Sequence, residues 1–165
     1  EEGESGWTQT FGNDGYIVIN DSTSLPAYAQ ATQSGASSFT WSTTTTETRA
    51  LQRASGTGRI AAAWFNNAAF DIAVTLTDGQ AHNVAFYALD WDSFTRAQRF
   101  DVFDANTNTL LDTQTIIFAG YVGGPILDVT GSGQGYLGKE DAVLISYSTV
   151  QPDPLVRESF LLTAG

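Results

Sequence analysis

A period-two pattern of large apolar residues in the middle of the chain is the feature that most constrains the fold. Four apolar side chains stand at every second position there: Phe70, Ile72, Val74 and Leu76. A period of two places them on one face of a β-strand. The Thr-Asp-Gly-Gln sequence at 77–80 is typical of a turn, and an aromatic-rich run over 83–91 returns as a second long strand. The pair predicts an antiparallel sheet with one buried face.

Strand-like segments recur along the rest of the chain at the spacing typical of a sandwich. They span 16–20, 38–43, 59–65, 98–104, 109–117, 125–130, 142–149 and 159–163. We therefore expect an all-β fold of about ten strands, in two antiparallel sheets packed face to face, with jelly-roll topology. No linker or repeat divides the sequence, so residues 1–165 are expected to form one domain with residues 1–6 frayed. The predicted core contains Phe70, Ile72, Val74, Phe86, Phe100 and Val102.

The charge balance limits the partners of such a domain. Seven Lys and Arg residues face eighteen Asp and Glu residues, for a net charge of −11. This balance disfavours nucleic acid, whose phosphates require basic groups, and anionic membrane surfaces. No apolar run approaches the ~20 residues that span a bilayer. Neutral partners remain, and neutral glycans are the first class to consider.

The sequence contains neither cysteine nor methionine. Without cysteine there is no disulfide framework, no zinc–thiolate site and no cysteine nucleophile. This composition suits secreted bacterial domains that fold without disulfides. Because the chain begins at Glu1 rather than methionine, we expect a processed, extracellular module of a larger secreted protein.

Candidate catalytic groups are few. The one histidine, His82, follows the turn at 77–80, where a solvated polar residue is expected more than a member of a Ser–His–Asp triad. Asp90 and Asp92 flank Trp91 and are the best paired carboxylates, the arrangement that glycosidases need. The interpretation we favour is that both order the following turn through backbone N–H groups.

A candidate metal site lies near the start of the chain. Asn13 and Asp14 precede a glycine in a tight turn, and Asp21 follows one short strand later. Oxygen ligands on loops suit calcium. The alternative is that Asn-Asp-Gly is a turn and nothing more.

Aromatic residues point to a binding function. Sugar rings stack on indole or phenol rings while polar side chains bind the hydroxyls. Trp41 and Trp64 lie in apolar strand patterns and are expected in the core, whereas Trp91 and Tyr121 lie beside polar turns. The predicted ligand-binding residues are Trp91, Asp92, Arg96, Tyr121 and Asp90. In the competing interpretation Trp91 points inward as a core anchor.

The stretch 78–92, with 100–104 and 111–113, resembles a carbohydrate-binding module of secreted bacterial glycan-degrading proteins. It is also similar, more loosely, to malectin-like and galactose-binding-like sandwiches. The resemblance covers 59–117 and implies a jelly roll that binds carbohydrate, often with a structural calcium. No binding residue of this chain is assigned on the basis of this resemblance.

Three functions remain open from the sequence. The first is a non-catalytic module that binds a neutral glycan through an aromatic platform and polar loop residues. The second is a structural or adhesive domain of a larger surface protein or filament. The third is a small glycan-active enzyme that uses Asp90 and Asp92.

Overall fold

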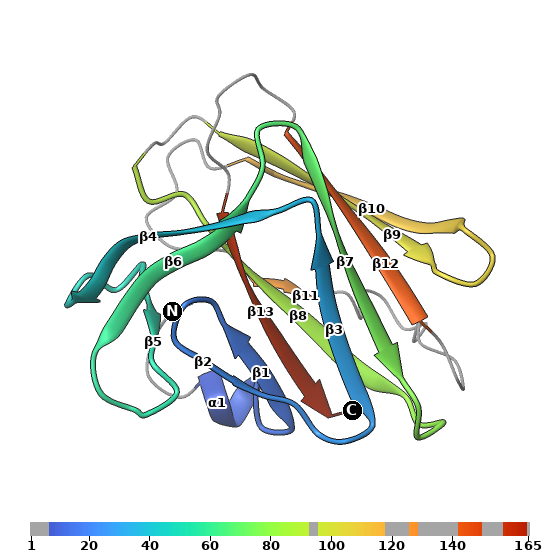
Figure 1. The fold of residues 1–165 in the computed structure, drawn as a ribbon, viewed down its shortest axis with the longest axis horizontal. Helices are drawn as coiled ribbons and strands as arrows, with labels where there is room; N and C mark the ends of the chain where they lie inside the picture. Colours follow the sequence, from blue (N-terminus) through green and yellow to red (C-terminus); the bar gives the residue numbers. More distant parts are fainter. Residues whose placement is uncertain (1–6, 93–95, 118–125, 129–141, 150–156, 165) are drawn as a thin grey trace.

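Two antiparallel β-sheets pack face to face in the computed structural model (Figure 1). It describes residues 7–92, 96–117, 126–128, 142–149 and 157–164, and β11 to β13 are described through their backbone pairing. A single turn of helix, α1 (Trp7–Thr10), precedes the strands. The strands are β1 (Gly15–Val18), β2 (Ser22–Ser24), β3 (Ala29–Ser34), β4 (Ser37–Thr45), β5 (Leu51–Gln52), β6 (Arg59–Phe65), β7 (Ala69–Leu76), β8 (His82–Leu89), β9 (Ala97–Asp104), β10 (Thr109–Ile117), β11 (Ile126–Asp128), β12 (Ala142–Thr149) and β13 (Arg157–Ala164).

The strand order shows that each sheet is assembled from distant parts of the chain. The smaller sheet has the order β10-β9-β12-β7-β3. The larger sheet has the order β11-β8-β13-β1-β2, and β6 also pairs with β13 in it. β4 and β5 both pair with β6. β12 lies between β9 and β7, and β13 between β8 and β1, so the last strands complete both sheets. These crossovers are of the kind from which jelly rolls are built. The predicted all-β antiparallel sandwich is confirmed.

The chain changes sheets at a glycine corner between β3 and β4 (Figure 1). Gly35 has a φ of +86°, a conformation that residues with a Cβ rarely adopt. Asn66, on the connection between β6 and β7, donates a hydrogen bond of 2.7 Å to the Gly35 carbonyl. The bond ties together two of the connections by which the chain passes from one sheet to the other. Among the described strands β4 pairs with β6 alone, so it lies at an edge of the larger sheet.

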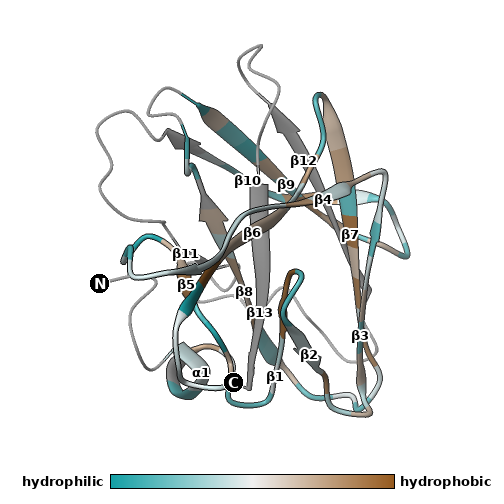
Figure 2. Ribbon diagram, turned by 60° about the vertical axis from the view of Figure 1, so that its left-hand side comes forward, coloured by the Kyte–Doolittle hydropathy of each residue, from teal (hydrophilic) through white to brown (hydrophobic). Residues whose placement is uncertain are grey.

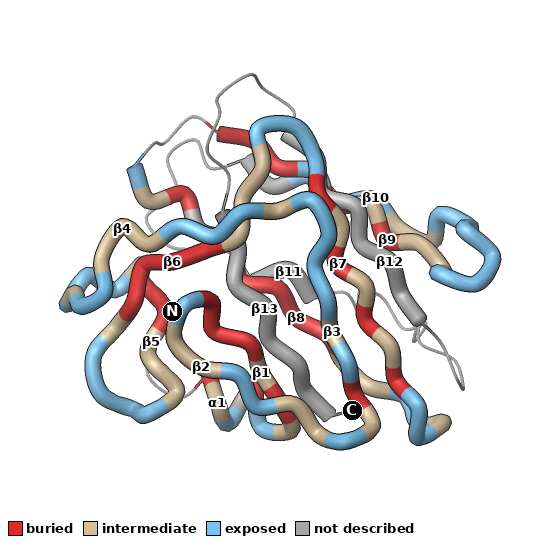
Figure 3. Tube along the Cα trace, in the orientation of Figure 1, coloured by how far each residue is buried: buried red, intermediate tan, exposed pale blue. Residues whose placement is uncertain are grey.

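Alternation along β7 and β9 builds the core between the sheets. In Figure 2 β7 is mostly brown with a teal break, and in Figure 3 buried and less buried residues alternate along it. The six residues predicted to be buried are at most 3% exposed, which confirms the register: Phe70, Ile72, Val74, Phe86, Phe100 and Val102.

A second apolar cluster covers the outer face of the larger sheet. Trp7 of α1 packs there with Leu51 and Tyr87, and its indole N–H donates a 2.8 Å hydrogen bond to the carbonyl of Gln52. Trp41 and Trp91 are partly buried at the margin of this cluster. Both faces of the larger sheet are therefore apolar, which explains why the sequence of β6 is almost continuously apolar.

Three strands were not expected from the sequence: β2, β3 and β5. β3 has the sequence AQATQS, whose alanines and glutamines have low strand propensity. It forms because it pairs along its whole length with β7. Among the described residues, no helix is long and apolar enough to cross a membrane.

Candidate functional site

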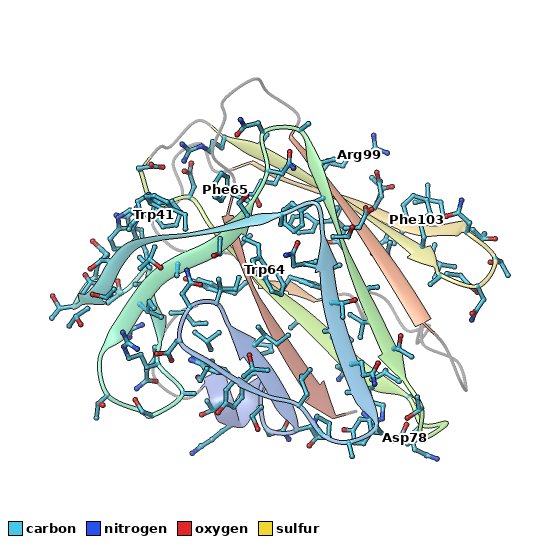
Figure 4. The ribbon with its side chains drawn as sticks, in the orientation of Figure 1. Trp41, Trp64, Phe65, Asp78, Arg99 and Phe103 are labelled. Carbon is cyan, nitrogen blue, oxygen red and sulfur yellow. The ribbon has the colours of Figure 1, made fainter. Side chains whose placement is uncertain are left out.

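Four aromatic side chains form a partly exposed group beside edge strand β4, here called the aromatic patch: Phe39, Trp41, Phe65 and Trp91. Phe39 and Trp41 belong to β4, Phe65 ends β6, and Trp91 follows β8. Phe39 is 43% exposed, one of two large hydrophobic side chains exposed to this degree among the described residues. Figure 4 shows Trp41 and Phe65 toward the upper left, above the broad faces of β4 and β6.

Neighbouring rings of the patch meet at steep angles. The centroids of Phe39 and Phe65 are 6.4 Å apart, with an interplanar angle of 86°. Phe39 and Trp41 are 5.7 Å apart at 88°, and Trp41 and Trp91 are 6.3 Å apart at 42°. The two contacts of Phe39 are edge-to-face, which is favourable because the positive edge of one ring meets the negative face of the next, whereas Trp41 and Trp91 are tilted.

Arg49 fixes Trp91 in the patch. Its guanidinium carbon lies 5.0 Å from the centroid of the Trp91 ring, over one face of the indole. Its Nη1 donates to the carbonyls of Trp91 and Asp90, at 3.3 and 3.4 Å. The Tyr87 hydroxyl in turn donates a 2.8 Å hydrogen bond to the Arg49 carbonyl. One side of Trp91 is therefore occupied by a cation that is anchored to the sheet.

Asp92 links the two tryptophans to a buried ion pair. The indole N–H of Trp41 donates to Asp92 Oδ2 at 3.1 Å. Arg96 Nη1 donates to Asp92 Oδ1 at 2.5 Å, and the same nitrogen also donates to Asp90 Oδ1. The Asp92 side chain is 37% exposed, so it lies at the surface beside the rings.

Asp90 and Arg96 lie beneath this surface. They are 7% and 5% exposed, and the backbone N–H of Arg96 also donates to Asp90. Burial raises the pKa of the Asp90 carboxyl above its ordinary value, and the charge and hydrogen bonds of Arg96 oppose that shift without cancelling it. The pair therefore holds the end of β8 against the start of β9.

The structure brings four of the five predicted ligand-binding residues together. Asp92 is exposed and Trp91 is partly buried, and the buried Asp90 and Arg96 are bonded next to them. Tyr121 lies outside the described residues. Asp90 is paired with Arg96. A role for any of these residues in binding stays a prediction.

Three members of the site were not predicted from the sequence: Phe39, Phe65 and Arg49. Trp41 was expected in the core but is only partly buried, whereas Trp64 packs against the core between the sheets (Figure 4). The aromatic–polar alternation around Trp41 is the same for a strand that faces a core and for an edge strand that faces solvent. Nothing in the sequence near Arg49 indicates that it lies on Trp91.

His82 is packed more tightly than expected. Its side chain is 7% exposed, its ring stacks on Tyr28 at 4.6 Å, and its Nε2 lies 2.9 Å from Asp78 Oδ2. A backbone hydrogen bond from Gln80, followed by the interaction with His82, lowers the pKa of Asp78. This group orders the turn between β7 and β8, far along the sheet from the aromatic patch.

The three predicted metal ligands have separate environments. Asn13 is exposed, Asp14 accepts a 2.8 Å hydrogen bond from the Tyr28 hydroxyl, and Asp21 accepts from Arg53. Burial, followed by the hydrogen bond to Asp14, raises the pKa of Tyr28 to about 12. No group of three His, Cys, Asp or Glu side chains that could hold a metal occurs in the described part of the chain.

Calcium binding at these residues stays a prediction. If Asn13, Asp14 and Asp21 hold the ion, excess chelator should lower the melting temperature, because calcium at about 100 times its Kd stabilises the folded state by about 2.7 kcal/mol. Differential scanning calorimetry with chelator, then with calcium or magnesium restored, measures the shift. An unchanged melting temperature in all three conditions would contradict the prediction.

No family model matches the sequence, and no curated protein matches it. Solved structures of carbohydrate-binding modules are similar to the chain. TmCBM61 in complex with beta-1,4-galactotriose has a TM-score of 0.38 and 7% identity, covering 84% of this chain and 86% of that one. CBM28, a module specific for non-crystalline cellulose, has a TM-score of 0.35 and 14% identity, covering 65% and 73%.

A third similar structure is the family 11 carbohydrate-binding module from Clostridium thermocellum, in complex with a beta-1,3-1,4-mixed-linked tetrasaccharide. Its TM-score is 0.33 and its identity 10%, and the alignment covers 91% of this chain and 93% of that one. All three neighbours are carbohydrate-binding modules, the class of domain that the sequence resembles. At these identities and TM-scores we match no residue of theirs to a residue here.

Proposed function

We propose that the domain binds a neutral carbohydrate at the aromatic patch and does not act on it chemically. The observation that carries the proposal is an exposed aromatic surface next to charged hydrogen-bonding groups. Phe39 and Trp41 supply apolar ring faces, and Asp92 and Arg49 lie at the same end of the sheet. Sugar recognition needs both components, apolar faces for the C–H groups and polar groups for the hydroxyls.

The positions of the polar groups support binding over catalysis. Asp90 and Asp92 accept hydrogen bonds from one nitrogen of Arg96, and Asp90 is almost fully buried. A glycosidase needs one carboxyl that reaches the glycosidic oxygen and a second that reaches the anomeric carbon or a water. Asp90 is instead bonded to Arg96 at the end of β8.

The edge at β4 gives little support to a filament-forming role. Arg53 donates to the carbonyl of Thr43, and Ser42 donates to the carbonyl of Thr44 at 2.8 Å. The pairing of β4 with β6 also shifts register twice, on either side of Ser42. Occupied carbonyls and bulges hinder the addition of another strand. We therefore place binding first.

Two alanine variants in the aromatic patch test the proposal. Trp41→Ala and Phe39→Ala are each expected to weaken glycan binding by about 30-fold, which is the loss of about 2 kcal/mol that an aromatic hot spot contributes. Affinity gel electrophoresis against a panel of soluble neutral polysaccharides, followed by calorimetry with the glycan that is retained, measures the change.

Leu110→Ala is the matched control. Leu110 is 49% exposed, close to the value for Phe39, but it lies on β10 in the other sheet. It is expected to bind as the parent protein does. Thermal unfolding of all three variants confirms that each is folded at the temperature of the binding experiment. Equal affinity in Phe39→Ala, Trp41→Ala and Leu110→Ala would contradict the proposed site.

A further inference from the structure

The angles between the rings of the aromatic patch bear on the physical form of the glycan. A sugar stacks by laying its C–H face flat on an aromatic face. In crystalline polysaccharide the exposed sugar rings lie parallel in one plane. Several aromatic rings can therefore contact such a surface together only if they are coplanar. Neighbouring rings here meet at 86°, 88° and 42°, so no two neighbours share a plane.

A bulge in β4 lies at the pair of rings with the largest of these angles. Phe39 and Trp41 are two residues apart, and on a regular strand their side chains would project in parallel. The pairing with β6 shifts register between Thr40 and Ser42, on either side of Trp41. A bulge of this kind increases the local twist and re-aims a side chain. The ring planes of Phe39 and Trp41, one on each side of Thr40, meet at 88°.

Hydrogen bonds hold the tryptophans in this arrangement. Asp92 accepts from the indole N–H of Trp41, and Arg96 in turn holds Asp92. Arg49 covers one face of Trp91 and bonds the adjacent backbone carbonyls. These contacts oppose rotation of Trp41 and Trp91 into a common plane.

We infer that the ligand is a single soluble chain of a neutral glycan, and not the surface of a crystalline polysaccharide. This inference rests on the proposed function. A single chain turns about its glycosidic bonds, so successive sugars can present their faces in the different directions that Phe39 and Trp41 require. The net charge of −11 opposes uronate-rich or sulfated chains, and so selects for uncharged ones.

The test compares soluble and crystalline probes on one protein preparation. The soluble probes are mixed-linkage β-glucan, galactan, xylan and mannan in affinity gels, and the crystalline ones are microcrystalline cellulose and chitin in depletion assays. We expect retardation by at least one soluble chain, about 30-fold weaker for Trp41→Ala. The crystalline probes should remove no more of the parent protein from solution than they remove of Trp41→Ala.

The outcomes separate the two proposals. Depletion by a crystalline probe that is lost in Trp41→Ala, with no retardation by soluble chains, would overturn the inference and leave carbohydrate binding intact. Retardation by a soluble uronate or sulfated chain in preference to the neutral ones would overturn the choice of an uncharged ligand. Binding to none of the probes would overturn the proposed function, and the inference with it.

Discussion

Replacing Arg96 by methionine is expected to lower the free energy of unfolding at pH 7 by about 3–5 kcal/mol. Arg96 is 5% exposed, and it is the cation that bonds the buried carboxylate of Asp90. Methionine fills much of the same volume without the charge, so Asp90 would be buried without its partner. Urea denaturation monitored by tryptophan fluorescence measures the loss.

The loss is expected to shrink as the pH falls toward 4. Burial already raises the pKa of Asp90, and Arg96 is the group that opposes this shift. Without Arg96 the folded-state pKa rises further above the unfolded value, which is about 3.9. A carboxyl group with a raised folded-state pKa binds its proton more tightly in the folded protein. The penalty is therefore absent below the unfolded pKa and grows as the pH rises to the folded-state pKa.

A double variant separates the buried charge from the lost packing. Asp90→Asn combined with Arg96→Met removes both charges and keeps similar volumes, so it is expected to recover most of the stability at pH 7. Asp92 is 37% exposed and remains solvated in both variants. A loss of unfolding free energy below about 0.5 kcal/mol in Arg96→Met alone would lie within the range of ordinary surface changes. It would show that the Asp90–Arg96 pair does not hold the end of β8 against the start of β9.

Phe100→Ala is expected to destabilise the protein by about 3–5 kcal/mol, because it removes a large ring from the closed core between the sheets. Phe100 is 0% exposed and packs in one cluster with Phe70 and Phe86. Chemical denaturation should show a lower midpoint with an unchanged slope, since the same surface is exposed on unfolding.

The matched change on the neighbouring strand is Leu110→Ala, which is expected to alter stability by no more than about 0.5 kcal/mol. Leu110 pairs with Phe103 on β9 but is 49% exposed. The comparison tests register, because a shift of one residue along β9 would turn Phe100 outward. A loss in Phe100→Ala as small as that in Leu110→Ala would contradict the register.

The site shows where local pattern stops being informative. The order Asp90–Trp91–Asp92 at the end of a long strand indicated polar side chains gathered where that strand ends, and both aspartates bond Arg96 there. The same pattern did not distinguish which aspartate is buried, because that depends on Arg96 and on how β9 returns to the sheet. For Trp41 the strand pattern favoured the core, but β4 is an edge strand with a bulge. Edge position is a property of the whole sheet.

The sequence by itself determined the all-β class, most of the strands and the six core residues, because period-two alternation is a local property and one buried face selects a single register. Only the tertiary structure decided the composition of the site. Trp41 reaches Asp92 across 51 residues of sequence, and Arg49 reaches the carbonyl of Trp91 across 42. Contacts at such separations arise from strand order and from the corner at Gly35 that carries β4 into the second sheet. No short-range pattern contains that information, because those contacts form and stabilise the protein only once both sheets have assembled.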